Sequence, residues 1–125
     1  MILTPDFCSI QDLRQEEHLV EAGMHWQENH PIFKGHFPGQ PVVPGVCMMQ
    51  MVKQVLETAW SVRLELVESG SIKFLLFIDP RQQPKTQLLV KRQKTENGLH
   101  TISAQITDGD KTFFKFNAVY RQIMV

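Results

Sequence analysis

The sequence has few cysteines and no excess of charge of either sign, and both shortages exclude whole classes of protein. Its two cysteines, Cys8 and Cys47, are far apart in the chain and lack the spacing of a metal site or a disulfide framework. Thirteen basic residues balance thirteen acidic ones, so the formal net charge is zero and no field attracts nucleic acid. We therefore expect a protein of a reducing compartment with no nucleic-acid partner.

Long hydrophobic runs are also missing. The longest one, residues 42–52, is interrupted by a proline, a glycine and a glutamine and is too short to span a bilayer. Residues 1–15 contain early acidic residues and lack the basic and then apolar pattern of a signal peptide. Hydrophobic residues nevertheless make up 42% of the 125 residues, which is ordinary for a globular protein of one domain. The expected location is the cytoplasm, without membrane contact.

The first half of the chain predicts a strand, an irregular loop and a helix. Residues 18–28 alternate between apolar and polar side chains, as in a half-buried strand. The following residues, 30–44, are rich in proline and glycine, which predicts irregular backbone. Residues 46–60 then have the periodicity of a helix, with two adjacent apolar stripes that indicate near-complete enclosure. The remaining narrow polar stripe consists of Gln50, Lys53, Gln54 and Glu57.

The second half of the chain predicts antiparallel strands joined by tight turns. Four β-rich segments follow the helix, at residues 71–78, 86–94, 99–106 and 112–121. The inward-facing side chains expected on the last two are Ile102, Ala104, Ile106, Phe114, Phe116, Ala118 and Tyr120. A sheet with one apolar helix can bury that helix only by curling around it. Residues 1–125 are therefore expected to form one α+β domain with a curved antiparallel sheet.

A distinctive motif lies at the head of the helix. Residues 35–46 read GHFPGQPVVPGV, in which Gly-His-Phe-Pro is followed by Pro-x-x-Pro-Gly. This segment resembles the active-site segment of the 3-hydroxyacyl-[acyl carrier protein] dehydratases, the FabZ/FabA-like family of the hot-dog superfamily. The order of strand, Pro/Gly loop, buried helix and strand meander fits the same family. The resemblance implies a hot-dog fold, in which a curved antiparallel sheet wraps around one long central helix.

The resemblance also implies roles for individual residues. His36 stands where the family's catalytic histidine removes a proton from the carbon next to the thioester carbonyl. Gly45 stands where a backbone N–H polarises that carbonyl, and Phe37, Pro44 and Val46 would contact the substrate. Elementary chemistry supports the role of Gly45 separately, because N–H groups at a helix N-terminus lack intrahelical acceptors and carry partial positive charge.

One residue departs from the family's pattern. Gln50 occupies the helix position where the family has a glutamate or aspartate that helps the hydroxyl leave as water. An amide can hold a hydroxyl by hydrogen bonds but cannot give or take a proton. Loss of a positioned general acid typically costs about two to four orders of magnitude in rate, although His36 itself could return the proton. The structural alternative is that Gln50 is only the first member of the helix's polar stripe.

The resemblance implies a class of substrate and a shared site. Family substrates are 3-hydroxyacyl thioesters on the phosphopantetheine arm of acyl carrier protein or on coenzyme A, and neither a metal nor a diffusible cofactor is needed. Two hot-dog domains join edge to edge in the family, so His36 of one protomer would face Gln50 of its partner. A homodimer, a trimer of dimers and a heterodimer with another hot-dog subunit all remain open.

Three functions are compatible with these residues. The favoured one is a dehydratase of fatty-acid or polyketide-type biosynthesis, which converts a 3-hydroxyacyl thioester into a trans-2-enoyl thioester. A thioesterase of the same fold would direct water at the carbonyl polarised at Gly45, but Gln50 offers no base for that water. A catalytically weakened subunit would bind acyl chains within a hot-dog heterodimer.

Residues near the motif have simpler structural explanations. Cys47 is expected to be a small buried hydrophobe rather than a nucleophile, because no second base is evident nearby. The methionines beside it are expected to pack in the core or to line an acyl tunnel. Lys53 and Glu57, one helical turn apart, are expected to form an ion pair. His30, before a proline, is expected to shape the loop.

Overall fold

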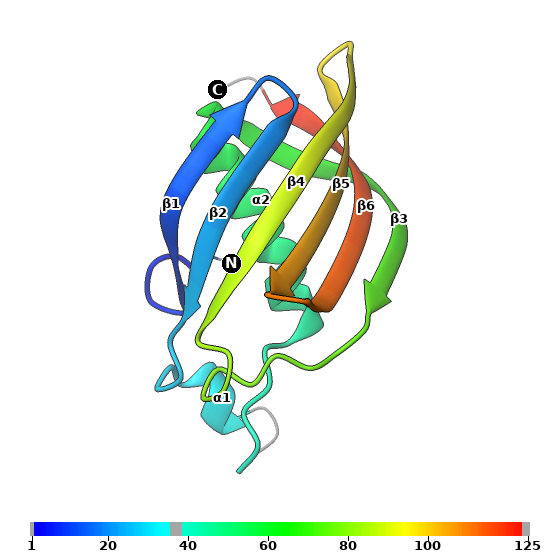
Figure 1. Cartoon of the computed structure of the whole chain (residues 1–125). Helices are drawn as coiled ribbons and strands as arrows, with labels where there is room; N and C mark the ends of the chain where they lie inside the picture. The colour runs from blue at the N-terminus through cyan, green and yellow to red at the C-terminus, as the bar shows by residue number, and fades with distance from the viewer. Residues whose placement is uncertain (1, 36–38, 124–125) are drawn as a thin grey trace.

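The computed structural model describes residues 2–35 and 39–123. In these residues a six-stranded antiparallel sheet curls around the long helix α2 (Figure 1). The order of strands across the sheet is β1-β2-β4-β5-β6-β3, which places β1 and β3 at its two edges. The elements are, in chain order, β1 (Cys8–Glu16), β2 (Leu19–Trp26), α1 (Ile32–Gly35), α2 (Gly45–Trp60), β3 (Arg63–Phe74), β4 (Lys85–Glu96), β5 (Leu99–Asp108) and β6 (Lys111–Ile123).

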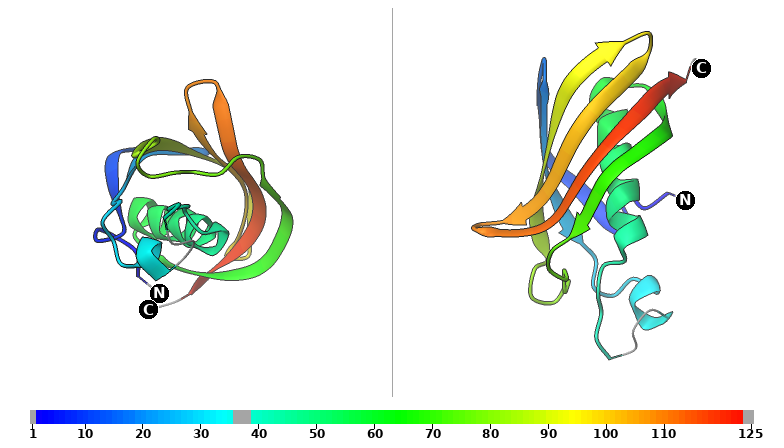
Figure 2. Two further views of the ribbon diagram at one scale, coloured as in Figure 1. Left: turned by 90° about the horizontal axis from the view of Figure 1, so that it is seen from below. Right: turned by 90° about the vertical axis from the view of Figure 1, so that its right-hand side faces the viewer.

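The concave face of the sheet holds the core. Viewed along α2, the sheet wraps around the helix (Figure 2, left). The predicted inward positions are all buried: Val20, Ala22, Met24, Trp26, Ile102, Ala104, Ile106, Phe114, Phe116, Ala118 and Tyr120. Truncating one of the buried aromatic side chains to alanine would typically cost about 3–5 kcal/mol. The alternation that the sequence predicts for β2, β5 and β6 is therefore confirmed.

Helix α2 begins at Gly45 and ends at Trp60, close to its predicted bounds. Ser61 follows in the left-handed region, with φ of 52°, and its N–H donates to the carbonyl of Glu57, which terminates the helix. The predicted polar stripe is wrong in one position, because Gln54 is only 8% exposed. Its Oε1 accepts a hydrogen bond from the backbone N–H of Leu3 at 3.1 Å, so the N-terminal segment covers this part of the helix.

The periodicity of the sequence does not predict strand β1. Most of its residues are exposed, because it forms an edge of the sheet. A bulge between Gln11 and Arg14, with Asp12 at φ of 50°, further interrupts the alternation. The described sheet therefore contains one more strand than the sequence pattern indicates.

Strand β3 lies earlier in the chain than the predicted segment 71–78. It is also an edge strand, and most of its residues are polar and exposed. The strand therefore lacks the apolar alternation from which it could be predicted. The apolar residues that suggested a strand, 74–77, lie at and beyond its end and remain exposed. The N–H of Leu75 still donates to the carbonyl of Phe113 at 2.8 Å, but the chain then leaves the sheet.

A short helix interrupts the loop that the sequence predicts to be irregular. Helix α1 follows Pro31, whose fixed φ suits the first turn of a helix. The Nδ1 atom of His30 accepts a hydrogen bond from the N–H of Ile32 at 3.1 Å, so His30 does shape this segment. Phe33 is buried and stacks on Phe7 with a centroid distance of 5.1 Å, which anchors α1 to the start of β1.

None of the helices in the described part of the chain has the length and apolar character that a bilayer crossing requires.

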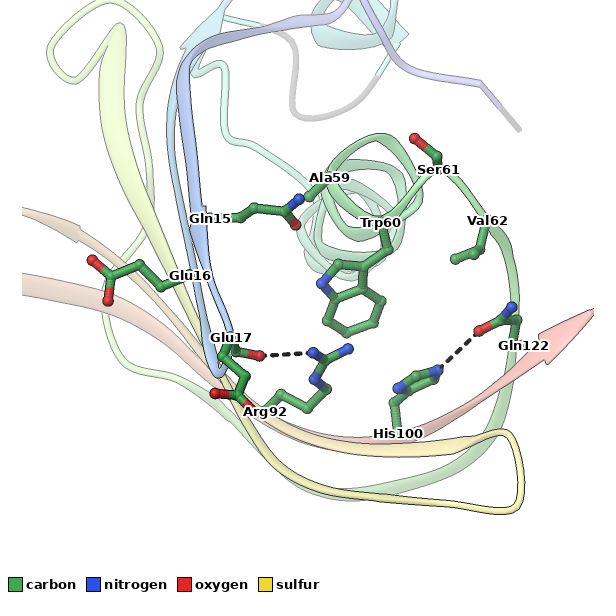
Figure 3. Close-up of a pocket in the computed structure, with 10 residues that line it drawn as sticks. All are labelled: Gln15, Glu16, Glu17, Ala59, Trp60, Ser61, Val62, Arg92, His100 and Gln122. Atoms are coloured by element: carbon green, nitrogen blue, oxygen red, sulfur yellow. Dashed lines mark hydrogen bonds between the residues drawn. The ribbon is translucent and has the colours of Figure 1, made fainter.

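Three stacked side chains cover the C-terminal end of α2 (Figure 3). The guanidinium of Arg92 lies 4.7 Å from the ring centroid of Trp60, and the imidazole of His100 lies 4.9 Å from the Trp60 ring. Arg92 Nη2 donates to the carbonyl of Glu17 at 2.7 Å, and His100 Nε2 lies 3.4 Å from Oε1 of Gln122. The stack joins α2, β4 and β5 at the end of the molecule opposite to Gly45.

The buried imidazole in this stack makes stability depend on pH. Burial lowers the pKa of His100, and the positive charge of Arg92 lowers it further, whereas the hydrogen bond to Gln122 opposes both effects. The unfolded chain therefore binds a proton more readily than the folded chain. The stability that neutral His100 contributes is complete above the ordinary histidine pKa of about 6.5 and is lost as the pH falls toward the lowered folded value.

His100→Gln is expected to flatten the pH dependence of the unfolding free energy. Between about pH 8 and about pH 5, His100 can remove up to about 1.4 kcal/mol of stability per pH unit from the wild type, and the glutamine variant lacks this contribution. Urea unfolding at several pH values measures the difference. The exposed Gln82 provides the control, since Gln82→Ala removes no titratable group and should leave the slope of the wild type unchanged. If the unfolding free energy has the same slope against pH in the wild type and in His100→Gln, His100 is not the source of the pH dependence.

Candidate active site

The chain enters α2 in a conformation that presents the helix N-terminus. Pro44 precedes the helix with φ of −62° and ψ of 144°, and its carbonyl accepts hydrogen bonds from the N–H groups of Cys47 and Met48 at 3.0 and 3.2 Å. The N–H groups of Gly45 and Val46 come earlier than the first intrahelical donor, so helix geometry provides them with no acceptor. They carry the positive end of the helix dipole, as a site for a polarised carbonyl requires.

An aromatic ring lies directly against the first residue of α2. A Cβ atom added to Gly45 would come within 2.6 Å of the ring of Phe74. Phe74 is 54% exposed and stacks on Phe114 with a centroid distance of 5.3 Å. Only glycine permits this approach without displacing the ring, so Gly45 has a steric reason for its identity in addition to its backbone N–H. The position of Phe74 at the helix start is a feature that the sequence pattern does not predict.

Gln50 lines a cavity on the face of α2 that the sheet leaves open. The cavity has a volume of about 260 Å³. Its lining residues are Val46, Met49, Gln50, Lys53, Leu66 and Tyr120. Val46 is 65% exposed at the end nearest to Gly45, whereas Tyr120 of β6 is buried behind the helix. The structure therefore places two predicted site residues, Val46 and Gln50, along one groove that starts beside the helix N-terminus.

Two predicted site residues, His36 and Phe37, lie outside the described residues. The described flanks are α1, which ends at Gly35, and Gly39, which has φ of 83°. Figure 1 shows α1 at the same end of the molecule as the start of α2. The roles of His36 and Phe37 remain predictions from the motif.

Cys47 has the environment of a structural residue. It is buried in the core, and burial raises the pKa of its thiol above the ordinary value. A thiol is nucleophilic only as a thiolate, so this environment opposes nucleophilic catalysis. Met48 and Met51 are buried beside it, whereas Met49 faces the cavity. The methionines thus divide between core packing and the groove.

The ion pair expected between Lys53 and Glu57 does not form in the described residues. Oε2 of Glu57 instead accepts a hydrogen bond from the backbone N–H of Leu64 at 2.9 Å. The connection between α2 and β3 therefore uses this carboxylate, and Lys53 is left on the wall of the groove. The sequence held a signal for this arrangement, because Gln50 and Lys53 lie on one face of the predicted helix.

The described residues bring together no group of three histidine, cysteine or acidic side chains that could hold a metal ion. A larger hollow, of about 740 Å³, lies at the C-terminal end of α2 around the stack of Trp60, Arg92 and His100 (Figure 3). Its walls include polar residues of β1 and β6 but no residue of the motif. Arg92 and His100 there are engaged with the carbonyl of Glu17 and with Gln122, and the motif lies at the other end of α2, so the groove beside Gly45 is the better candidate for chemistry.

The contact between Phe74 and residue 45 predicts a change of sign in a double-mutant cycle. Gly45→Ala is expected to destabilise the wild type, because the new Cβ displaces the Phe74 ring. In a Phe74→Ala background the same change is expected to stabilise the protein by up to about 1 kcal/mol, the helix propensity difference. Urea unfolding should give a coupling of about 0.5–3 kcal/mol.

Gly70→Ala is the matched control for this cycle, since its Cβ would approach Asn117 only to 3.4 Å and lies away from Phe74. It should have the same effect in both backgrounds. Equal effects of Gly45→Ala in the two backgrounds would contradict the contact.

Comparisons with known proteins find dehydratases among the relatives. A 3-hydroxyacyl-[acyl-carrier-protein] dehydratase FabZ from Caulobacter sp. (strain K31) is 39% identical over 91 residues, which cover 73% of this chain and 52% of that protein. A FabZ from Klebsiella pneumoniae is 28% identical over 92 residues, which cover 68% of this chain and 61% of that protein. The chain thus spans between about half and three fifths of the length of these curated relatives.

Solved structures share the fold at lower sequence identity. A chain of the dehydratase heterocomplex ApeI:P from Xenorhabdus doucetiae is similar with a TM-score of 0.66 and 23% identity, covering 90% of this chain and 96% of that chain. A thioesterase mutant from Staphylococcus aureus is similar with a TM-score of 0.69 and 11% identity, covering 98% of both chains. The expected α+β hot-dog fold is therefore confirmed.

A family model extends the likeness over most of the sequence. The model described as ApeI-like, ApeI dehydratase, matches residues 12–114. This range includes the motif at the head of α2, strands β2 to β5 and all the residues that line the groove except Tyr120. The chain belongs to the ApeI-like family of FabZ-like hot-dog dehydratases.

Proposed function

We propose that this protein removes water from 3-hydroxyacyl thioesters to give trans-2-enoyl thioesters, in fatty-acid or polyketide-type biosynthesis. The observation that carries the proposal is the position of Gly45 at the first turn of α2, beside the groove lined by Val46 and Gln50. Membership of a dehydratase family supports the reaction class. The names of the FabZ relatives support acyl carrier protein as the carrier, with coenzyme A as the alternative.

The proposed reaction divides the work among three groups. The N–H of Gly45 donates to the thioester oxygen and stabilises the negative charge that develops there. Neutral His36 removes the proton from C2, the electron pair forms the C2–C3 double bond, and the C3 hydroxyl leaves. Gln50 positions that hydroxyl by hydrogen bonding but supplies no proton. Pro44, Val46 and Phe37 contact the acyl or pantetheine chain.

A dimer would complete the site. Strand β3 is an edge of the sheet, so its backbone can pair with a strand of a second subunit. Exposed apolar side chains lie along and just beyond it, including Leu66, Val67 and the 81% exposed Phe77. In the proposed dimer, β3 strands meet and His36 of one protomer faces Gln50 of the other. A heterodimer with a second hot-dog subunit is the alternative, and the solved heterocomplex among the structural relatives supports it.

Assays with both forms of the substrate test the reaction. The wild type is expected to interconvert 3-hydroxyacyl and trans-2-enoyl thioesters, and His36→Ala is expected to abolish this activity because it removes the proposed base. Gln50→Glu is expected to keep this activity, since it places a carboxylate where the family has one. Absorbance of the enoyl thioester follows the reaction.

The same assays distinguish the alternatives. Free thiol released without interconversion would contradict the dehydratase and indicate a thioesterase. Binding without turnover by the wild type, together with activity in Gln50→Glu, would indicate a catalytically weakened acyl-binding subunit. His25→Ala, a change on β2 away from the groove, is the control that should leave every activity unchanged.

A further inference from the structure

The groove that holds Gln50 also holds a cationic side chain. Lys53 follows Gln50 by one helical turn on α2, and both line the cavity of about 260 Å³. Residues with this spacing are neighbours on a helix surface, with Cβ atoms about 5–6 Å apart. The described residues bring no carboxylate within ion-pair distance of Lys53. Its expected partner, Glu57, instead accepts the N–H of Leu64.

The other polar groups of the cavity are poor proton donors. Of the described residues that line it, Gln50, Lys53 and Tyr120 carry polar side chains. An amide such as Gln50 has no proton to give at neutral pH. Burial raises the pKa of Tyr120, and the negative charge of Glu57 raises it further, so its hydroxyl releases a proton less readily than an exposed tyrosine. An ammonium group has three hydrogens and can release one.

We propose that Lys53 is the proton donor to the departing hydroxyl, and that it replaces the acid that Gln50 cannot supply. This assignment rests on the proposed dehydration of 3-hydroxyacyl thioesters. Lys53 belongs to the same helix as Gln50, so both approach the substrate from the same protomer. Gln50 holds the hydroxyl at the near end of the groove, and the flexible lysine side chain reaches it from the next turn.

The step balances without any further reactant. His36 takes the proton from C2, the C–H electron pair becomes the C2–C3 double bond, and the C3–O bond breaks with its pair on oxygen. That oxygen takes one proton from the Lys53 ammonium and leaves as water. His36 is then protonated and Lys53 is a neutral amine, so one proton passing from the imidazolium to the amine through solvent restores both groups.

A change of leaving group tests the proton donation directly. Hydroxide requires a proton to leave, whereas fluoride leaves from a 3-fluoroacyl thioester without one. Lys53→Met is expected to lower kcat for the 3-hydroxyacyl substrate by about 10²–10⁴-fold and to change KM little. The same variant should eliminate fluoride at nearly the rate of the wild type. His36→Ala should lose both eliminations, because both begin at the same C2 proton.

Two further variants distinguish proton donation from an effect of the positive charge and from a nonspecific effect of a lysine-to-methionine change. Lys53→Arg keeps the positive charge, but a guanidinium does not release a proton in proteins, so it should not restore the loss of water. Lys115→Met makes the same change on the exposed surface of β6 and should behave as the wild type. Unfolding curves should confirm that Lys53→Met is folded.

The possible outcomes each decide the assignment. Three outcomes would overturn the role of Lys53 while the dehydratase stands. Lys53→Arg could restore the loss of water, or Lys53→Met could lose both eliminations equally or lose neither. If neither the wild type nor Gln50→Glu eliminates water or fluoride, the proposed function itself is overturned, and the role of Lys53 with it. Selective loss of the hydroxyl reaction supports the assignment.

Discussion

The burial of one helix inside a curved sheet is the constraint on which the rest of the molecule depends. Four inward positions of α2 are fully buried: Met51, Val52, Val55 and Leu56. Close packing around them sets where the helix lies and therefore where it begins. Just before that beginning, the N–H of Val43 donates to the carbonyl of Ile78 at 2.9 Å, which holds the approach to the helix as well. The amide donors at Gly45 are thus preorganised, as stabilisation of a developing oxyanion requires.

The groove beside this helix start combines an amide side chain with a cationic one. Gln50 and Lys53 lie one helical turn apart on the same wall. The Phe74 ring lies against Gly45, whose N–H would hold the thioester in the proposed complex. In the proposed reaction, chemistry at this place depends on the hydrogen bonding of Gln50 and on the cation of Lys53.

The sequence predicted the elements that touch the core and missed those at the edges. Side chains of β2, β5, β6 and α2 alternate between burial and exposure, so their periodicity identifies them. Strands β1 and β3 bury little, and bulges interrupt both, so no period remains to be detected. The motif predicted Gly45, Val46 and Gln50 at one site, but contacts between distant segments, such as Phe74 with Gly45, follow from the path of an edge strand that periodicity cannot reveal.

The central claim is that a thioester binds at the N-terminus of α2 with its acyl chain in the groove. A crystal structure with a stable amide analogue of a 3-hydroxyacyl pantetheine thioester tests this most directly. The account predicts the carbonyl oxygen at about 3 Å from the Gly45 nitrogen, the imidazole of His36 beside C2, and the C3 hydroxyl between Gln50 and Lys53. An analogue bound at the opposite end of α2, around Trp60 and His100, or a carbonyl pointing away from Gly45, would contradict it.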